Sequence, residues 1–405
     1  MLTEKQQNDL HASIYEYMLS TPKFETAAKA FASDCGFPPP PPSQQPNSAI
    51  PLLEKKWVSI ARLSKKVMDL EKQLATLRKP DASENNPDTN SRRLPTTVTK
   101  TLKGHRSPIT SVALHPVYSQ LASSSEDGSI KLWDLDSGCV EDTLKGHTNV
   151  VNYVEFNGDG TKLVSCSVDM SIKLWEKGKC VRTLRGHDHN ISSVKFCGGG
   201  SSLVSVSRDK TVRFWDASTG YCQHTNPIAH SEWVRCVASN GGVDQNLVAT
   251  GSNDHTICIF KLNDHDLKKT NLALTLTGHE HHIEDLAFPP SSNSDKKKLA
   301  GMDWLVSGSR DKTVKLWSAS NGTLLHTFSE FQNWVRGVLI HPSLKYIIAC
   351  GDDKSIRILD VENKRCLKSI EEAHGHFVSC IGMHKSLPLL VSGSADATMN
   401  VFALR

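Results

Sequence analysis

Side chains that could serve as a nucleophile, a general base and an orienting acid recur along this chain of 405 residues. In the clearest copies a Gly-His pair precedes an Asp by a fixed distance, a Ser lies shortly before the Asp, and a Trp follows it. These copies are His105, Asp127 and Trp133; His147, Asp169 and Trp175; and His187, Asp209 and Trp215. A Ser, a His and an Asp form hydrolytic triads, but a catalytic set has no reason to recur seven times. A buried hydrogen-bond network is the better interpretation, because a buried Asp is tolerated only when paired and a Trp N–H seeks an acceptor.

Four weaker copies follow the same spacing. They are His230, Asp254 and Phe260; His279, Asp311 and Trp317; Asp353 and Leu359, with Glu330-Phe331 in place of Gly-His; and His374, Asp396 and Phe402. Seven copies between residues 98 and 405 give a period of about 44 residues, which is typical of a WD-repeat β-propeller with one four-stranded blade per repeat. We therefore predict an all-β propeller of seven blades over residues 97–405. Blade six lacks its His, so we expect it to be looser near Trp334.

Within a repeat the residues alternate as half-buried strands should. Ser171–Trp175 places Ile172 and Leu174 on one face, Lys162–Ser167 is expected to be the preceding strand, and 168–170 the turn between them. The chain stops at Arg405 without a fourth strand for the last blade. The apolar and β-branched segment Thr96–Leu102 is expected to supply that strand and so remove the exposed sheet edges.

Composition limits the classes of protein that fit. A net charge of +4 is too small to indicate nucleic-acid binding, and no apolar segment is long enough to span a membrane. The eleven cysteines include no C-x-x-C pair, which favours a reduced, cytosolic protein. Cysteines at one repeated blade position are expected to be buried in the core: Cys139, Cys180, Cys222 and Cys366.

The segment before the propeller is expected to be helical and to pair two chains. Residues 3–36 show two short helical patterns, whose apolar faces are too small to be stable without a partner, and the simplest partner is a second copy. Residues 37–51 form a proline-rich spacer, or alternatively a ligand for aromatic-groove domains. The heptad pattern of 52–78 predicts a dimeric coiled coil, or alternatively an amphipathic helix against its own chain. Residues 79–96 form a polar linker that we expect to be disordered. The apolar positions assigned to dimerisation are Leu10, Ile14, Tyr17, Phe24, Ala27, Phe31, Ile60, Leu63, Val67, Leu70, Leu74 and Leu77.

The order of these segments resembles a known family. Residues 14–19 with Thr26–Ala28 and Phe31 look like a LisH motif, and stretches such as Leu52–Trp57 and Asn333–Val338 are close to the phrasing of the lissencephaly-1 family, also called nuclear distribution protein F. The resemblance covers nearly the whole chain. It implies a non-enzymatic dimer without cofactors that binds the motor domain of cytoplasmic dynein and promotes microtubule-dependent transport, nuclear positioning and spindle functions. It also implies a coiled-coil adaptor of the nuclear distribution E type as a partner and, in animals, the catalytic subunits of a platelet-activating-factor acetylhydrolase. The implied location is the cytoplasm, with microtubules and the centrosome or spindle pole.

The residues that would face the motor lie beside the Gly-His loops and Asp turns, which must share one rim of the disc. Matching to the family pattern implies Arg208, Trp233, Arg235, Arg310, Trp334 and Arg336. Exposed aromatic and Arg side chains are the usual anchors of protein interfaces. The alternative is that the Trp side chains fill space between blades and the Arg side chains pair with neighbouring acids.

Other functions are weaker hypotheses. A LisH and WD-repeat scaffold could instead be a transcriptional co-repressor or a ubiquitin-ligase substrate receptor. A hydrolase would need a Ser, His and Asp set outside the blades. His279, His281 and His282 suggest zinc, but His279 has a blade role and no cysteine or acid completes a ligand set, so no metal is expected. The insertion at 289–303 is expected to be a solvated loop.

Overall fold

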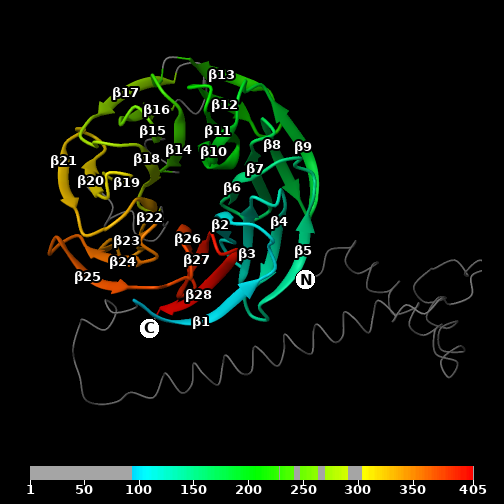
Figure 1. The fold of residues 1–405 in the computed structure, drawn as a ribbon. Helices are drawn as coiled ribbons and strands as arrows, with labels where there is room; N and C mark the ends of the chain where they lie inside the picture. Colours follow the sequence, from blue (N-terminus) through cyan, green and yellow to red (C-terminus); the bar gives the residue numbers. More distant parts are fainter. Residues whose placement is uncertain (1–93, 228, 241–246, 263–269, 291–302, 405) are drawn as a thin grey trace, which may run out of the picture. The chain divides into compact units, whose positions relative to one another are not determined.

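The chain folds into a ring of seven antiparallel four-stranded sheets, which confirms the predicted all-β propeller (Figure 1). The computed structural model describes residues 94–404 except 228, 241–246, 263–269 and 291–302. The expected LisH helices, spacer and coiled coil, and most of the expected linker and 289–303 loop, lie outside the described residues. Among the described residues there is no helix with the length and apolarity needed to span a bilayer.

Each blade is a meander in which the first strand is the innermost, next to the centre of the ring, and the fourth is the outermost. The strands of blades one to three are β2 (Ile109–Leu114), β3 (Gln120–Ser125), β4 (Ile130–Asp134) and β5 (Cys139–Leu144); β6 (Val151–Phe156), β7 (Lys162–Ser167), β8 (Ser171–Glu176) and β9 (Lys179–Arg185); and β10 (Ile191–Cys197), β11 (Ser202–Ser207), β12 (Val212–Asp216) and β13 (Cys222–Asn226), with a short 3-10 turn at Gly198–Gly200. Those of blades four and five are β14 (Val234–Ser239), β15 (Leu247–Ser252), β16 (Ile257–Lys261) and β17 (Asn271–Leu276); and β18 (Ile283–Ala287), β19 (Trp304–Ser309), β20 (Val314–Ser318) and β21 (Leu324–Phe328). Those of blade six and the three inner strands of blade seven are β22 (Val335–Ile340), β23 (Tyr346–Gly351), β24 (Ile356–Asp360) and β25 (Arg365–Ile370); and β26 (Val378–Met383), β27 (Leu389–Ser394) and β28 (Thr398–Leu404).

The core lies between neighbouring sheets. The second strand of every blade is buried from its second residue onward, as in β7 and β11, because adjacent blades cover both of its faces. These strands are rich in Ser, Ala and Gly, and small side chains let the sheets approach closely. The three largest fully buried side chains are Trp133, Trp215 and Trp317, which come from the third strands of their blades and pack between blades.

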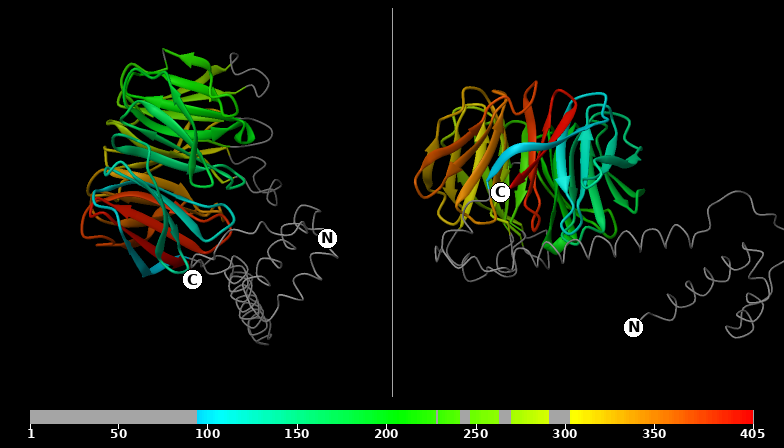
Figure 2. Two further views of the ribbon diagram at one scale, coloured as in Figure 1. Left: turned by 90° about the vertical axis from the view of Figure 1, so that its right-hand side faces the viewer. Right: turned by 90° about the horizontal axis from the view of Figure 1, so that it is seen from below.

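The ring closes with a strand from the start of the described chain. The outermost strand of blade seven is β1 (Pro95–Lys103), which pairs antiparallel with β28 and extends one residue beyond each end of the expected segment Thr96–Leu102 (Figures 1 and 2). Thr101 Oγ1 donates to Asn400 Oδ1 at 2.6 Å, and Leu102 is buried against Val401 and Met399. The expectation that an early strand completes the last blade is confirmed.

The prediction of buried cysteines at one blade position is wrong. Cys139, Cys180 and Cys222 are exposed and Cys366 is half-buried. All four stand at or near the start of an outermost strand, whose outer edge pairs with no further strand of its sheet and lies at the circumference of the ring. The buried thiols instead lie on the first three strands of blades, for example Cys166 and Cys350.

Candidate protein-interaction surface

Four side chains form a continuous hydrogen-bond network in each of the best-preserved blades. In blade one, His105 Nδ1 lies 2.8 Å from Asp127 Oδ2, and His105 Nε2 lies 2.8 Å from Ser123 Oγ. Trp133 Nε1 donates to the same Ser123 Oγ at 2.8 Å. The network therefore ties the loop before the first strand to the turn after the second strand and to the third strand.

The other blades repeat this arrangement with small changes. The same four partners, at similar distances, are His147, Asp169, Ser165 and Trp175; His187, Asp209, Ser205 and Trp215; and His279, Asp311, Ser307 and Trp317. Two blades lack the Trp but keep the rest: His230 with Asp254 and Thr250, and His374 with Asp396 and Ser392.

Blade six replaces the network by apolar contact. Phe331, Ala349 and Leu359 stand where other blades have His, Ser and Trp, and all three belong to one buried cluster. Arg357 supplies the hydrogen-bond donor that the missing His would have provided, since its Nη2 lies 3.3 Å from Asp353 Oδ2 and its guanidinium stacks on the Phe331 ring. Replacing both partners of a hydrogen bond by apolar groups costs little, which explains how this blade keeps its sheet.

The network stabilises the blade, and its Ser hydroxyl is buried away from any substrate. Burial alone would raise the pKa of Asp209, but hydrogen bonds from His187 and from Thr211 outweigh it and hold the pKa well below its usual range. Ser205 is fully buried and its Oγ is already engaged by His187 and Trp215. A nucleophile must reach a substrate, so this Ser cannot act as one in the folded blade.

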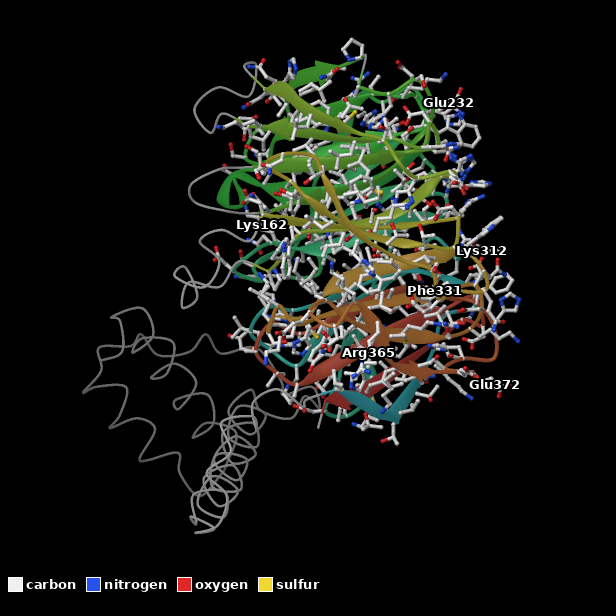
Figure 3. All side chains as sticks on the ribbon, turned by 90° about the vertical axis from the view of Figure 1, so that its left-hand side faces the viewer. Lys162, Glu232, Lys312, Phe331, Arg365 and Glu372 are labelled. Carbon is white, nitrogen blue, oxygen red and sulfur yellow. The ribbon has the colours of Figure 1, made fainter. Side chains whose placement is uncertain are left out.

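The His loops and Asp turns lie on one face of the disc, because each His bonds its Asp. Figure 3 shows Glu232 and Lys312 along this face, with Lys162 on the opposite one. The charged and aromatic residues singled out from the sequence occur in the same loops and turns, or in the first residues of the strands that follow them.

The first aromatic group on this face joins blades three and four. The guanidinium of Arg208 stacks on the ring of Trp233, with 4.7 Å between the Arg carbon and the ring centroid. Trp233 keeps 38% of its surface exposed. Among the described residues Arg208 has no acidic partner within ion-pair distance, so no neighbouring carboxylate neutralises its charge.

The second group centres on Glu284, which three guanidiniums share. Arg235 Nη1 lies 3.3 Å from Glu284 Oε1, Arg336 Nη1 lies 3.4 Å from Glu284 Oε2, and the Arg310 Nε also contacts Oε1. Arg336 also forms a bidentate ion pair with Asp352, in which Nε donates to Oδ1 at 2.8 Å and Nη2 donates to Oδ2 at 2.9 Å. The guanidiniums of Arg310 and Arg336 both lie over the ring of Trp334, at 4.1 and 5.2 Å from its centroid.

The structure thus places all six sequence-derived residues in one surface that spans blades three to six. We call Arg208, Trp233, Arg235, Arg310, Trp334 and Arg336, with Glu284, the basic arc. Three of its four Arg side chains pair with acids, as the alternative interpretation held. These acids are only two, Glu284 and Asp352, so the four Arg side chains leave the arc with a net positive charge.

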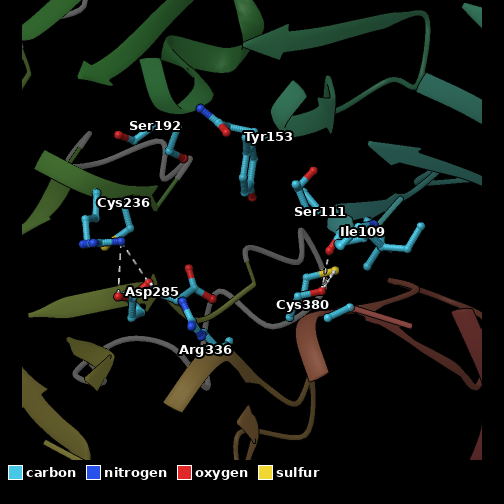
Figure 4. Close-up of a pocket in the computed structure, with 18 of the residues that line it drawn as sticks. Ile109, Ser111, Tyr153, Ser192, Cys236, Asp285, Arg336 and Cys380 are labelled. Atoms are coloured by element: carbon cyan, nitrogen blue, oxygen red, sulfur yellow. Dashed lines mark hydrogen bonds and ion pairs between the residues drawn. The ribbon is translucent and has the colours of Figure 1, made fainter. Parts of the chain in front are cut away.

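The basic arc borders the mouth of the central channel. A pocket of about 400 Å³ is lined by the innermost strands of all seven blades, and Arg208, Trp233, Arg235, Glu284 and Arg336 lie at it. Figure 4 shows Tyr153, Asp285 and Arg336 pointing into this space from different blades. Burial raises the pKa of Asp285 to about 6, although its carboxylate accepts the Val338 N–H at 2.9 Å.

Sequence reasoning missed Glu284 and Asp352. Glu284 occupies the same place in blade five that Arg235 has in blade four and Arg336 in blade six, five residues after the His position. Aligning the repeats at that place would have found it. Asp352 is harder to find, because it stands beside the network residue Asp353 and resembles a second copy of it.

Comparison with known proteins agrees with this architecture. The WD domain, G-beta repeat family matches seven times, at residues 96–134, 138–176, 178–216, 220–261, 270–318, 322–360 and 364–402. The chain is 38% identical to nuclear distribution protein PAC1 of Coccidioides posadasii over 94% of this chain and 86% of that protein. It is 40% identical to nuclear distribution protein nudF of Aspergillus niger over 94% of this chain and 89% of that protein, and 38% identical to nudF of Emericella nidulans over 82% and 78%. The chain belongs to the nuclear distribution protein PAC1/nudF family.

The family resemblance drawn from the sequence is thereby confirmed. In this member of the PAC1/nudF family each matched repeat spans the outermost strand of one blade and the three inner strands of the next, as repeat 96–134 spans β1 to β4. The offset explains why the ring must close between its two ends. The basic arc is contributed by the third to sixth repeats.

Proposed function

We propose that this chain is a non-enzymatic regulator of cytoplasmic dynein in nuclear distribution, and that the basic arc contacts the motor domain. The observation that supports this is the stacking of Arg208 on Trp233 and of Arg310 and Arg336 on Trp334, on one face of the propeller. The name of the relatives supports the pathway, since all three are nuclear distribution proteins.

The arc has the physical properties of an interface centre. Tryptophan and arginine are the residue types that most often carry binding energy, and a stacked, ion-paired guanidinium is held in place before the partner arrives. Arg310 and Arg336 are fixed by Glu284, Asp352 and Trp334 together. Its positive charge favours an acidic surface on the partner.

We also propose how the protein assembles with itself and with its partners. The chain would act as a homodimer through residues 3–36 and 52–78, bind an adaptor of the nuclear distribution E type, and work in the cytoplasm on microtubules and at the centrosome or spindle pole. Acetylhydrolase subunits are a further proposed partner. No catalytic role is proposed, because the Ser and Thr hydroxyls of the blade networks are fully buried.

The test is co-purification of the dynein heavy chain with the full-length protein. An Arg310→Ala, Trp334→Ala variant removes one stacked pair and leaves Glu284 neutralised by Arg235 and Arg336. We expect it to keep its fold and lose most of the captured motor, by at least tenfold. The matched control is Arg182→Ala, Tyr221→Ala, which removes one Arg and one aromatic from the outer part of the blades, where both are exposed.

Capture that falls equally in both variants, or that is unchanged in the Arg310 and Trp334 variant, would place the motor elsewhere on the protein. No capture by the wild-type chain would reject dynein as the partner.

A further inference from the structure

Three histidines from two adjacent blades meet on the face that carries the basic arc. His255 lies in the turn between β15 and β16, and His281 and His282 lie in the loop before β18. The ring centroids are 4.4 Å apart for His281 and His282, 5.9 Å for His255 and His281, and 5.8 Å for His255 and His282. One nitrogen of each ring lies within 4.8 Å of those of the other two, and all three residues are half-buried.

The propeller brings these residues together because the Asp turn of one blade abuts the His loop of the next. At the junction of blades three and four this contact is an ion pair, in which Lys210 Nζ lies 3.5 Å from Glu232 and 2.7 Å from the Ser231 carbonyl. His255 and His281 occupy the places of Lys210 and Glu232 at the next junction. The contact between a cation and an anion is thus replaced by a contact between imidazoles.

Neutral imidazole nitrogens are ligands for zinc and other borderline divalent transition metals. His282 Nδ1 is buried and has no hydrogen-bond partner among the residues that the structure describes. The positively charged Arg235 and Arg310 lie near His282. The two guanidiniums oppose a metal ion, but both are paired with Glu284.

We propose that His255, His281 and His282 form a binding site for one zinc-class divalent metal ion, with water as the remaining ligand. Zinc–nitrogen bonds are about 2.0–2.1 Å long, which puts tetrahedral ligand atoms about 3.3 Å apart, so ring nitrogens that are now within 4.8 Å of one another must approach by up to about 1.5 Å. His281 Nδ1 accepts the backbone N–H of His282 at 2.8 Å, so the neutral ring carries its proton on Nε2. The ring gives up this hydrogen bond when it binds the ion: either Nδ1 becomes the ligand, or the proton moves from Nε2 to Nδ1 and Nε2 becomes the ligand. The ligand that sequence reasoning lacked is His255, since it stands far from the other two along the chain.

Other blades supply variants that remove a ligand without disturbing the loop. Asn149 and Asn333 occupy the place of His281 in blades two and six, and their Oδ1 atoms accept the following backbone N–H at 2.8 and 2.9 Å. His281→Asn should therefore keep the local hydrogen bond. Lys210 and Lys312 share the left-handed φ of 69° found at His255, so His255→Lys fits that backbone as well.

The matched control is His189→Asn. His189 occupies the His281 place in blade three and accepts the Asn190 N–H at 2.8 Å, as His281 does from His282. The residue that follows it is Asn190, and the turn of the preceding blade offers Met170 in the place of His255. This control therefore removes an equivalent His that has neither of the two histidine neighbours.

The experiment is a zinc titration of the full-length, metal-stripped chain at pH 7.5 in competition with a chromophoric chelator. We expect one zinc ion per chain for the wild type and for His189→Asn, and at least tenfold weaker binding for His281→Asn and His255→Lys. Cobalt(II) is the second probe, and its absorption spectrum should lack the charge-transfer band of a thiolate ligand.

No saturable zinc binding by the wild type, or equal affinity of His281→Asn and His189→Asn, would overturn the proposal. A thiolate band that persists in His281→Asn would assign the metal to cysteines and overturn it too. The measurement uses the chain alone, so its outcome does not depend on whether dynein is the partner.

Discussion

At the scale of single residues, Asp209 shows how much of a blade depends on one carboxylate. It accepts hydrogen bonds from His187 Nδ1 at 2.7 Å, from the Asp188 N–H at 3.0 Å, and from the Thr211 N–H and hydroxyl at 2.9 and 2.7 Å. Asp209→Ala should lower the free energy of unfolding by about 1–3 kcal/mol, because buried donors lose their acceptor. Chemical denaturation measures this loss. Asp159→Ala, at an exposed turn residue, is the control and should change stability little. Equal stability of the two variants would contradict the importance of the network.

Asp285 differs from Asp209 in that its ionised form destabilises the folded state, because its carboxylate is buried in the wall of the channel. Its pKa is raised to about 6 by burial, so its favourable contribution is present below about pH 4 and is lost as the pH rises through 6. Asp285→Asn removes this loss and keeps an oxygen that can accept the Val338 N–H. The stability of the variant relative to the wild type should therefore improve by about 1 kcal/mol between pH 5 and pH 7.5. Denaturation of both proteins at the two pH values tests this, and a constant difference would show that Asp285 does not titrate in this range.

At the scale of elements, the closing strand β1 should behave as an ordinary outermost strand. Leu102 of β1, Leu144 of β5 and Leu184 of β9 are equivalent and almost fully buried. Removing a buried Leu side chain costs about 2–5 kcal/mol. We expect Leu102→Ala and Leu144→Ala to lower the free energy of unfolding by similar amounts in that range, measured by denaturation. A much smaller cost for Leu102→Ala would mean that the ring is stable without its closing contact.

The elements also show what the sequence could and could not predict. The blade count and closure followed from the repeat, because every blade uses the same spacing. The exposure of Cys139 and Cys180 was predicted wrongly, since the pattern gives a position within the blade but not whether another sheet covers it. Contacts between blades, such as Arg336 with Glu284 and His255 with His281, depend on distant segments meeting, and no local pattern reports them.

At the scale of the whole molecule, the proposed dimer would join two basic arcs in one assembly. A single arc offers one patch on one face, and two arcs on linked chains could engage two motor domains or two sites of one motor. Linking two binding modules raises the overall affinity by about 10²–10⁴ when both can bind at once. On this proposal, dimerisation through residues 3–36 and 52–78 would strengthen binding by joining two basic arcs.

Replacing Phe24 and Phe31 by Glu tests this coupling. Both residues belong to the apolar stripes assigned to dimerisation, and charges there should prevent two chains from associating because a buried, unpaired carboxylate is costly. Light scattering should report a monomer, and the propeller should unfold at the same denaturant concentration as in the wild type. Capture of dynein should weaken at least tenfold although the basic arc is intact. Glu replacements at Lys23 and Lys29, which lie between the stripe positions, are the control and should leave a dimer. A monomer that captures the motor as well as the wild type would separate dimerisation from binding and assign the whole affinity to one arc.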